Sequence, residues 1–357
     1  MTNSTQPTFW LWLLQNTALW QIISFAVSGL LMLMFGGPLI AWLKNLRGMK
    51  WSAREDTPDT HLAKAGTPSM GGLGIISAAT LTFFVVFLVN QMLMRRVPNA
   101  PALSGEFLLL LFTVPLITLA HLALGFADDW SKARGKGGLR ARDKFLGQVV
   151  LMLAFFILVG VGQRTGVTSD VFVLRDASLP LLALLAVVIV GTCNAVNITD
   201  GIDGLAAGLC VQVGLAFALL GFFSADWWLC LAGACFGFLA FNRFPARVFM
   251  GDTGSLALGA ALGAGAVLSR AMWLLPFVGF IFYVELLSVT AQVLWFKYTR
   301  KQTGEGKRLF RRAPLHHHFE LGGWSEWRVV TTFWGINLIT TLIGIVLWQN
   351  GMLPRFP

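Results

Sequence analysis

Ten apolar segments run through the sequence, and they constrain its fold more than any other feature. A helix needs about 20 apolar residues to cross the roughly 30 Å hydrocarbon core of a bilayer. The segments cover residues 18–42, 71–93, 106–126, 144–162, 178–198, 204–223, 227–242, 254–270, 272–296 and 329–349. Only 12% of the residues are charged, about half the share that is usual in a soluble domain. We therefore predict an all-α integral membrane protein with about ten transmembrane helices, folded as a single polytopic domain over residues 1–357.

The distribution of lysine and arginine predicts how these helices are oriented. Five connections carry 21 of the 27 basic residues, namely 43–70, 127–144, 199–203, 243–253 and 297–328. Basic loops stay in the cytoplasm, so we place these five there and both termini on the other side. Residues 1–17 have no basic residue and only a short apolar run, so we expect an interfacial segment. The net charge of +10 thus reflects topology, and no motif indicates a nucleic-acid partner.

Polar residues interrupt the apolar pattern between the fifth and sixth segments. Asn197, Asp200 and Asp203 follow one another at intervals of three residues, with Gly201 and Gly204 among them. A carboxylate in the middle of a bilayer costs about 2.5–3.5 kcal/mol on insertion scales. These groups should therefore lie at the membrane surface, where carboxylates beside closely approaching backbone suit a bound nucleotide or metal. For this stretch taken alone, a capped turn without a ligand is the alternative.

Two other cytoplasmic loops bring charged and hydroxyl groups to helix ends. The first contains the turn Lys-Ala-Gly-Thr-Pro-Ser-Met-Gly-Gly before the second apolar segment, and backbone N–H groups at a helix start favour anions. The polar side chains of this turn are Lys64, Thr67 and Ser69. The next loop opens with Asp128 and Asp129, and Lys132 follows at a spacing that places it on their helical face. An ordinary turn and a solvated charged loop are the respective alternatives.

The last two cytoplasmic loops add an acid, an aromatic ring and a run of histidines. Asp252 stands between two glycines at a helix start, where a carboxylate can hold a Mg²⁺ that also touches a phosphate, although a simple N-cap is the alternative. Phe249 offers a flat face on which a base can stack. The long basic loop 297–328 carries three consecutive histidines, which we expect to contact phosphates or a leaving group rather than zinc. Glu285 and Gln292 are out of place in lipid and should face the protein interior.

Taken together, these motifs resemble those of one family. The patterns are Lys-x-Gly-Thr-Pro-x-Met-Gly-Gly, Asp-Asp-x-x-Lys, Asn-x-x-Asp-Gly-x-Asp-Gly-Leu, Phe-Met-Gly-Asp-x-Gly-Ser-Leu and Pro-x-His-His-His-Phe-Glu. They are similar to those of the MraY family, the phospho-N-acetylmuramoyl-pentapeptide transferases, within the polyprenyl-phosphate N-acetylhexosamine-1-phosphate transferase superfamily. The resemblance extends from about Leu43 to Trp348, and the histidine run points to this branch. Ser69 stands where threonine is commoner, and the hydroxyl remains.

The resemblance implies a reaction in the bacterial cytoplasmic membrane, with the active site facing the cytoplasm. Undecaprenyl phosphate attacks the diphosphate of UDP-N-acetylmuramoyl-pentapeptide (UDP-MurNAc-pentapeptide), which gives lipid I and UMP in the first membrane step of peptidoglycan synthesis. It also implies a homodimer and a Mg²⁺ ion held by Asp252. The implied catalytic residues are Asp128, Asp129, Lys132, Asp252 and His316. The implied substrate-binding residues are Lys64, Thr67, Ser69, Asn197, Asp200, Asp203, Asn242, Phe249, Gln292, His316 and His317.

Two questions stay open at this point. Asp128 could deprotonate the lipid phosphate or only position it, because a phosphate monoester has a second pKa near 6 and is largely a dianion at pH 7. The function could also differ. A transferase for UDP-GlcNAc or another UDP-HexNAc shares the central motifs, and a secondary transporter would also carry acids in broken helices. The histidine run argues against the first alternative, and the gathering of acids on one side of the membrane argues against the second.

Overall fold

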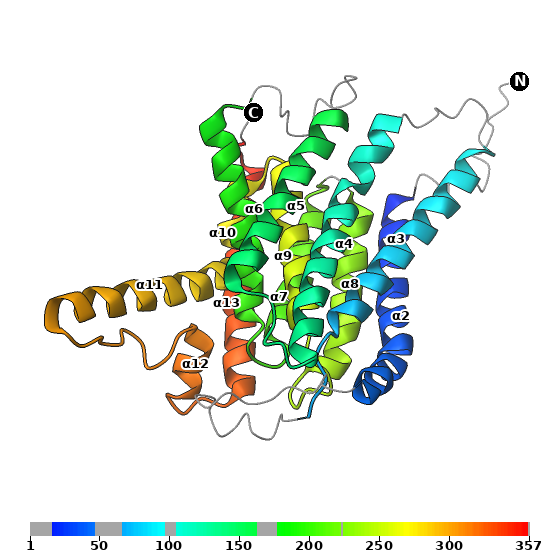
Figure 1. Cartoon of the computed structure of the whole chain (residues 1–357). Helices are drawn as coiled ribbons and strands as arrows, with labels where there is room; N and C mark the ends of the chain where they lie inside the picture. Colours follow the sequence, from blue (N-terminus) through cyan, green and yellow to red (C-terminus); the bar gives the residue numbers. More distant parts are fainter. Residues whose placement is uncertain (1–15, 47–65, 97–104, 163–176, 223, 356–357) are drawn as a thin grey trace, which may run out of the picture.

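A computed structural model describes residues 16–46, 66–96, 105–162, 177–222 and 224–355, and these residues form helices and connecting loops without a strand (Figure 1). The long helices are α2 (Thr17–Asn45), α3 (Gly72–Met94), α4 (Gly105–Ala133), α5 (Ala141–Gly162), α6 (Leu179–Thr199), α7 (Leu205–Leu219), α8 (Ala225–Asn242), α9 (Gly251–Leu268), α11 (Phe280–Thr303) and α13 (Glu326–Gln349). The short elements are η3 (Met272–Leu274), α10 (Leu275–Val278) and α12 (Leu315–Glu320).

The long helices other than α11 run side by side in one bundle, and α11 leaves it sideways (Figure 1). The start of α2 and the end of α13 lie at the same end of the bundle, whereas α12 lies at the other end. This arrangement agrees with the prediction that both termini share one side. Which side faces the cytoplasm stays a prediction.

Eight helices in the described part of the chain are long and apolar enough to cross a membrane. They are α2, α3, α4, α5, α6, α8, α11 and α13. The two predicted segments outside this set are α7, which has 15 residues, and the glycine-rich α9. An all-helical integral membrane protein is therefore supported, and the number of about ten crossings stays a prediction.

Two sequence-based boundaries were wrong in ways that affect the site. The predicted single segment 272–296 is divided into η3, α10 and α11, with the break at Gly279. Hydropathy alone does not detect such a break, because the sequence stays apolar across it. The third segment continues as helix α4 to Ala133, well beyond its predicted end at 126. Asp128, Asp129 and Lys132 therefore lie on this helix, as their spacing predicted.

Helix α9 is the buried centre of the bundle. Its residues from Thr253 to Leu268 are all buried, and most of them are glycine, alanine or leucine. Small side chains allow membrane helices to approach closely. A Cβ atom on Gly259 would lie 2.6 Å from the Cα atom of Cys193, and one on Gly125 would overlap the carbonyl oxygen of Asp252. Because α6 and α4 touch the α9 backbone in this way, their polar ends converge at its first turn.

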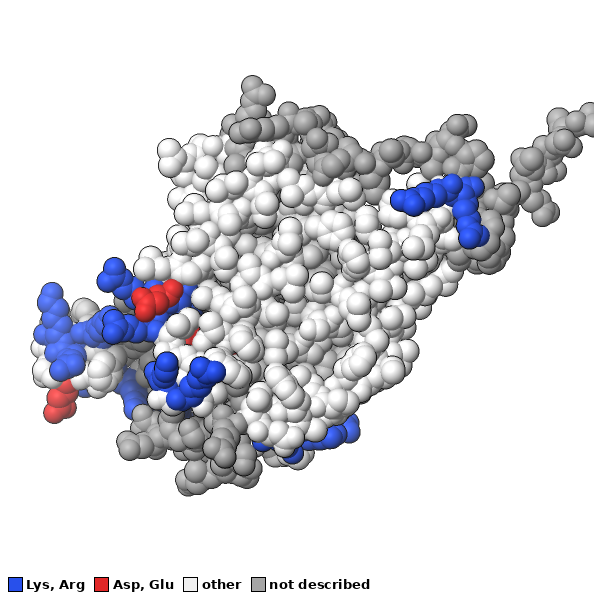
Figure 2. All heavy atoms as spheres, turned by 45° about the vertical axis from the view of Figure 1, so that its right-hand side comes forward, with Lys and Arg blue, Asp and Glu red and all other residues white. Residues whose placement is uncertain are grey.

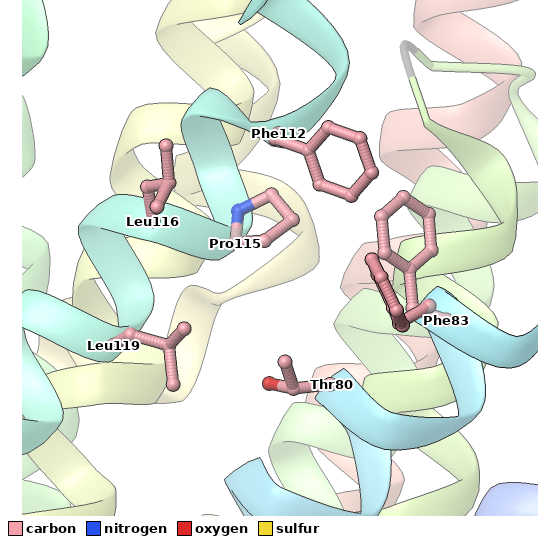
Figure 3. Close-up of a pocket in the computed structure, with 7 residues that line it drawn as sticks. Thr80, Phe83, Phe112, Pro115, Leu116 and Leu119 are labelled. Carbon is pink, nitrogen blue, oxygen red and sulfur yellow. The ribbon is translucent and has the colours of Figure 1, made fainter. Parts of the chain in front are cut away.

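The surface carries few charges outside the ends of the bundle. Figure 2 shows a broad field of uncharged residues, with lysine and arginine gathered in the lower part of the view and in one smaller patch at the upper right. Such a field fits a hydrocarbon environment. The described part of the chain contains an apolar crevice of about 300 Å³ between α3 and α4 (Figure 3), lined by Thr80, Phe83, Phe84, Phe112, Pro115, Leu116 and Leu119. Its lining has no ionisable group, so the crevice offers no acid, base or metal ligand for a reaction.

Candidate active site

Three carboxylates from two helices meet at the end of the bundle that carries α12. Asp128 and Asp129 lie near the end of α4, and Asp252 lies in the first turn of α9. One oxygen atom from each carboxylate lies within 4.8 Å of those of the other two. The Asp128 and Asp129 side chains are almost fully buried, with 3% and 6% of their surface exposed. The sequence predicted these residues as site members, and the fold brings them together.

Asp128 and Asp129 have different partners, as their adjacent positions on a helix require. Asp128 forms an ion pair with Lys132 at 2.6 Å and accepts the backbone N–H of Leu139 at 2.6 Å. Asp129 instead faces α9, where it accepts the backbone N–H of Thr253 at 2.9 Å and its hydroxyl at 2.7 Å. Asp129 therefore fixes α4 on α9 through Oδ2, while its Oδ1 atom lies 3.5 Å from the Lys132 Nζ atom. Asp128 is the acid of this pair that lies within 4 Å of both lysines.

Two lysines neutralise Asp252. Its Oδ2 atom lies 2.6 Å from the Lys132 Nζ atom and 2.7 Å from the Lys144 Nζ atom. Lys144, in the first two turns of α5, also lies 3.8 Å from Asp128. The Lys132 side chain is 43% exposed, against 13% for Asp252, so an incoming anion can reach it. The sequence interpretation counted Lys144 only among the basic loop residues. Its position at the start of an apolar segment is the signal that could have identified it.

Asparagine and glycine residues complete this arrangement. Asn197, near the end of α6, donates to Asp252 Oδ1 at 2.6 Å and to the Ser255 hydroxyl at 2.8 Å. Gly251 has a φ of +74°, a backbone conformation that favours glycine. A Cβ atom there would lie 2.5 Å from Asp129 Oδ2 and 2.6 Å from the Ser69 hydroxyl. The glycine before Asp252 thus lets the turn carrying Ser69 approach the carboxylates.

The donor set fits a hard divalent cation. Carboxylate oxygens are the ligands that Mg²⁺ prefers, at about 2.0–2.1 Å in octahedral geometry. Opposite ligands of such an ion are therefore about 4.2 Å apart, close to the 4.8 Å within which the three carboxylate oxygens lie. Burial raises the pKa of both Asp128 and Asp129, and the neighbouring Asp252 raises it further, so a bound cation would favour their ionised forms. Asp128, Asp129 and Asp252 are the residues that could hold it.

Asp200 lies beside this cluster, just after α6. Its carboxylate accepts the backbone N–H of Gly251. Burial raises the pKa of Asp200 well above its usual range, and the negative charges of Asp252 and Asp129 raise it further. Burial and the neighbouring acids thus favour the protonated form of Asp200. The predicted binding residue Asp200 is thus close to the site.

Asp203 and Asn242 connect backbone segments rather than face open space. Asp203 Oδ2 accepts the N–H of Ala246 at 2.8 Å, and Asn242 Oδ1 accepts that of Gly204 at 3.0 Å. Asn242 also donates to the Val248 carbonyl at 3.0 Å. Both side chains are buried. These contacts join the α6–α7 loop to the α8–α9 loop, and the substrate contact predicted for the two residues stays a prediction.

The turn after residue 65 is held by the backbone of Phe249. Its N–H donates to the Pro68 carbonyl at 2.9 Å, and its carbonyl accepts the N–H of Gly71 at 2.8 Å. The Phe249 side chain is half-buried, as are those of Thr67 and Ser69 in the turn. Lys64 lies outside the described residues. Stacking of a base on Phe249 stays a prediction.

The histidine run forms the short helix α12, and its members differ in exposure. The His316 side chain is 1% exposed, whereas that of His317 is 14% exposed. His317 Nδ1 lies 2.8 Å from Glu320 Oε2, one helical turn on. Gln292, which was also predicted to bind substrate, accepts the N–H groups of Leu309 and Phe310 at 3.0 and 2.9 Å. Gln292 therefore holds the chain together here, and the substrate contacts predicted for His316, His317 and Gln292 stay predictions.

Comparison with known proteins assigns the chain to a family. Residues 110–270, which run from α4 through α9, match the glycosyl transferase family 4 profile. Phospho-N-acetylmuramoyl-pentapeptide-transferase of Heliobacterium modesticaldum is 43% identical over 334 residues, covering 91% of this chain and 96% of the relative. The enzymes of the same name from Bacillus pumilus and Desulforudis audaxviator are 41% and 40% identical over similar lengths. The chain belongs to the phospho-N-acetylmuramoyl-pentapeptide transferase family.

Membership of the phospho-N-acetylmuramoyl-pentapeptide transferase family makes the chain a transferase, so the secondary transporter considered from sequence is wrong. The matched region 110–270 contains the three clustered carboxylates and Asn197. Helix α12 and its histidines lie beyond that region but within the alignment to the relatives, which covers 91% of the chain. The expected family resemblance is therefore confirmed over nearly the whole sequence.

The transferase should lose stability on acidification through His317. Burial lowers the pKa of His317 from 6.5 to about 4, although its hydrogen bond to Glu320 favours the proton. Between these values the unfolded chain binds a proton that the folded chain excludes, so stability falls as the pH drops through this window. Between pH 7 and pH 5 we expect the wild type to lose about 1–2 kcal/mol more than His317→Gln, measured as thermal midpoints in detergent. Equal losses in both proteins would contradict this.

Proposed function

We propose that this transferase moves phospho-N-acetylmuramoyl-pentapeptide from UDP-MurNAc-pentapeptide to undecaprenyl phosphate and so forms lipid I and UMP. The observation that carries the proposal is the cluster of Asp128, Asp129 and Asp252 with two lysines, in a chain 43% identical to an enzyme of that name. The cluster lies at the end of membrane-length helices, so a water-soluble nucleotide and a lipid phosphate can both reach it. The relatives' names favour the muramoyl-pentapeptide donor over another UDP-HexNAc.

The chemistry requires two anionic phosphates to approach each other. An oxygen of the lipid phosphate forms a bond to the phosphorus next to the sugar while the bond from that phosphorus to UMP breaks. Lys132 and Lys144 supply fixed positive charge for both reactants, because phosphoryl transfer depends mainly on positioning and electrostatic stabilisation. Asp128, which faces the lysines, orients the lipid phosphate. Positioning suffices for this role, since the phosphate is largely a dianion at pH 7.

Mg²⁺ is the cofactor we infer for this site, with Asp252 as its main ligand. When bound, it neutralises charge on the diphosphate and on the leaving group. The residues of the chain prepare the site for it. Asn197 orients Asp252 through Oδ1, and the lysine contacts at Oδ2 mark the position where positive charge is stabilised. Asp129 keeps α4 and α9 in register so that Asp128 stays within reach.

The orientation we propose places this end of the bundle in the cytoplasm of a bacterial cell, with the protein in the inner membrane. The support is the lysine and arginine distribution, because 21 of the 27 basic residues fall in the five connections at this end. A site that faces the cytoplasm would also be open to the water-soluble UDP-linked donor. The homodimer expected from the family resemblance stays a proposal.

Release of UMP from purified enzyme tests the proposed reaction. With undecaprenyl phosphate present, we expect Mg²⁺-dependent release from UDP-MurNAc-pentapeptide and at least about a hundredfold less from UDP-GlcNAc, since the missing lactyl-peptide removes binding contacts. Chelation with EDTA should stop the reaction, and adding back Mg²⁺ should restore it. Equal rates with the two donors would favour the wider UDP-HexNAc function, and full activity in EDTA would exclude a catalytic divalent ion.

A further inference from the structure

A buried histidine on α12 lies between α11 and the loop that joins α6 to α7. The backbone N–H of His316 donates to Glu285 Oε1 on α11 at 3.0 Å. The His316 Nδ1 atom lies 3.3 Å from the same oxygen. Neither side chain is exposed. Glu285, which has no role in the chemistry above, thus anchors this histidine from one side.

Gly201, in the α6–α7 loop, meets the other side of the His316 ring. A Cβ atom on Gly201 would overlap the Nε2 and Cε1 atoms of His316. Gly201 is not among the glycines with positive φ, so its backbone conformation is open to alanine. The histidine ring is therefore what restricts this position to glycine.

The same face of α11 also binds the segment that leads into α12. Gln292 lies seven residues after Glu285, which is two helical turns, so the two side chains share a face. Gln292 accepts the N–H groups of Leu309 and Phe310. The segment from Leu309 to His316 is thus fixed to α11 at both of its ends. This double attachment gives His316 a defined position against Gly201.

The position of Gly201 affects the carboxylate cluster because the preceding residue, Asp200, contacts the turn that carries Asp252. Asp200 accepts the backbone N–H of Gly251, and Gly251 directly precedes Asp252. A continuous set of contacts therefore leads from Glu285 through His316 and Gly201 to the first turn of α9. A shift of the loop by the width of a methyl group would be transmitted to Asp200.

We propose that Glu285 is a positioning residue, which holds the His316 ring as a spacer between α11 and the Gly201 loop and so sets the donor side of the active site. In this role the ring acts through its size, because a Cβ atom on Gly201 would overlap its Nε2 and Cε1 atoms. The proposal rests on the proposed function, in which the family resemblance places Asp200 on the nucleoside side of the site, so the affected substrate is the UDP-linked donor. Glu285 touches no reacting atom, and its effect passes through His316.

A double-mutant cycle of Gly201→Ala and His316→Ala tests the spacer. Gly201→Ala alone should raise the KM for UDP-MurNAc-pentapeptide by about tenfold, with little change in the KM for undecaprenyl phosphate, because misplacement of binding groups by a fraction of an ångström is costly. Removing the ring leaves room for the methyl group, so the double variant should be no worse than His316→Ala. Gly191→Ala is the matched control, since nothing lies within 4 Å of a Cβ atom there.

Glu285 variants complete the test. His316→Ala and Glu285→Ala should each raise the KM for the donor selectively, and the two changes together should add nothing to either one. Glu285→Gln keeps an acceptor for the His316 N–H and should recover most of the loss. Additive effects in the Gly201–His316 cycle, an unchanged donor KM in Gly201→Ala, or equal changes in both KM values would overturn the proposal. The thermal midpoints of the same four proteins can be measured without substrate. If the midpoints show coupling between Gly201 and His316 but the wild type releases no UMP, the proposed function is rejected and the contact between the two residues is not.

Discussion

Asp252→Asn should reduce UMP release by at least about a thousandfold at every Mg²⁺ concentration while the protein stays folded. The Oδ2 atom of Asp252 forms ion pairs with both Lys132 and Lys144, and Oδ1 accepts a hydrogen bond from Asn197. Asparagine keeps the size of the side chain but removes its charge, so the lysines lose their common partner. Removing one well-placed electrostatic group costs about 10²–10³ in rate, and here the group is also the inferred metal ligand.

The fold should tolerate this change because the remaining charges balance. Asp128 and Asp129 then face two ammonium groups, and the contacts of Asp129 with Thr253 are untouched. Asp143→Asn is the control, since Asp143 is exposed in the first turn of α5 directly beside Lys144. Its rate and thermal midpoint should match the wild type. Recovery of the Asp252→Asn rate at high Mg²⁺ would show that the residue affects only metal affinity, and a near-normal rate would remove it from the site.

The spacing of charged residues in the sequence predicted the centre of this site. Asp128, Asp129 and Lys132 are local neighbours on one helix, and helical periodicity is enough to place the lysine beside both acids. Asp252 was identified by its glycine neighbours, and Gly251 does have the positive φ that such a pattern indicates. Short-range geometry is encoded in short stretches of sequence, so these predictions did not require knowledge of the tertiary fold.

Residues whose partners are distant in the sequence were harder to interpret. Asp203, Asn242 and Gln292 were predicted to bind substrate, and in the structure they accept backbone N–H groups from other loops. A polar side chain that satisfies buried backbone looks the same in a sequence as one that faces a ligand, since both are needed where loops converge. The pairing of Glu285 with His316 spans 31 residues and a helix break, so no local pattern indicates it.

Gly125→Ala should strongly reduce both the activity and the stability of the protein, although Gly125 has no side chain that could take part in the chemistry. Gly125 lies one helical turn before Asp129 on the face of α4 that meets α9, and an added Cβ atom would overlap the carbonyl oxygen of Asp252. Helix α9 is buried along its length and cannot move away, so α4 must shift. Asp128 and Asp129 are part of α4 and would shift with it. We therefore expect UMP release to fall by at least about a hundredfold, because displacing a positioning group by about 1 Å can cost that much in rate.

The thermal midpoint should fall in the same variant, because the overlap is with backbone rather than with a flexible side chain. Gly335→Ala is the matched control, since it also lies inside a membrane-length helix and a Cβ atom there has nothing within 4 Å. Alanine is favoured over glycine in a helix by up to about 1 kcal/mol, so this control should keep its rate and melt at the same or a higher temperature. A wild-type rate in Gly125→Ala would mean that the function of the clustered carboxylates does not depend on the close approach of α4 to α9.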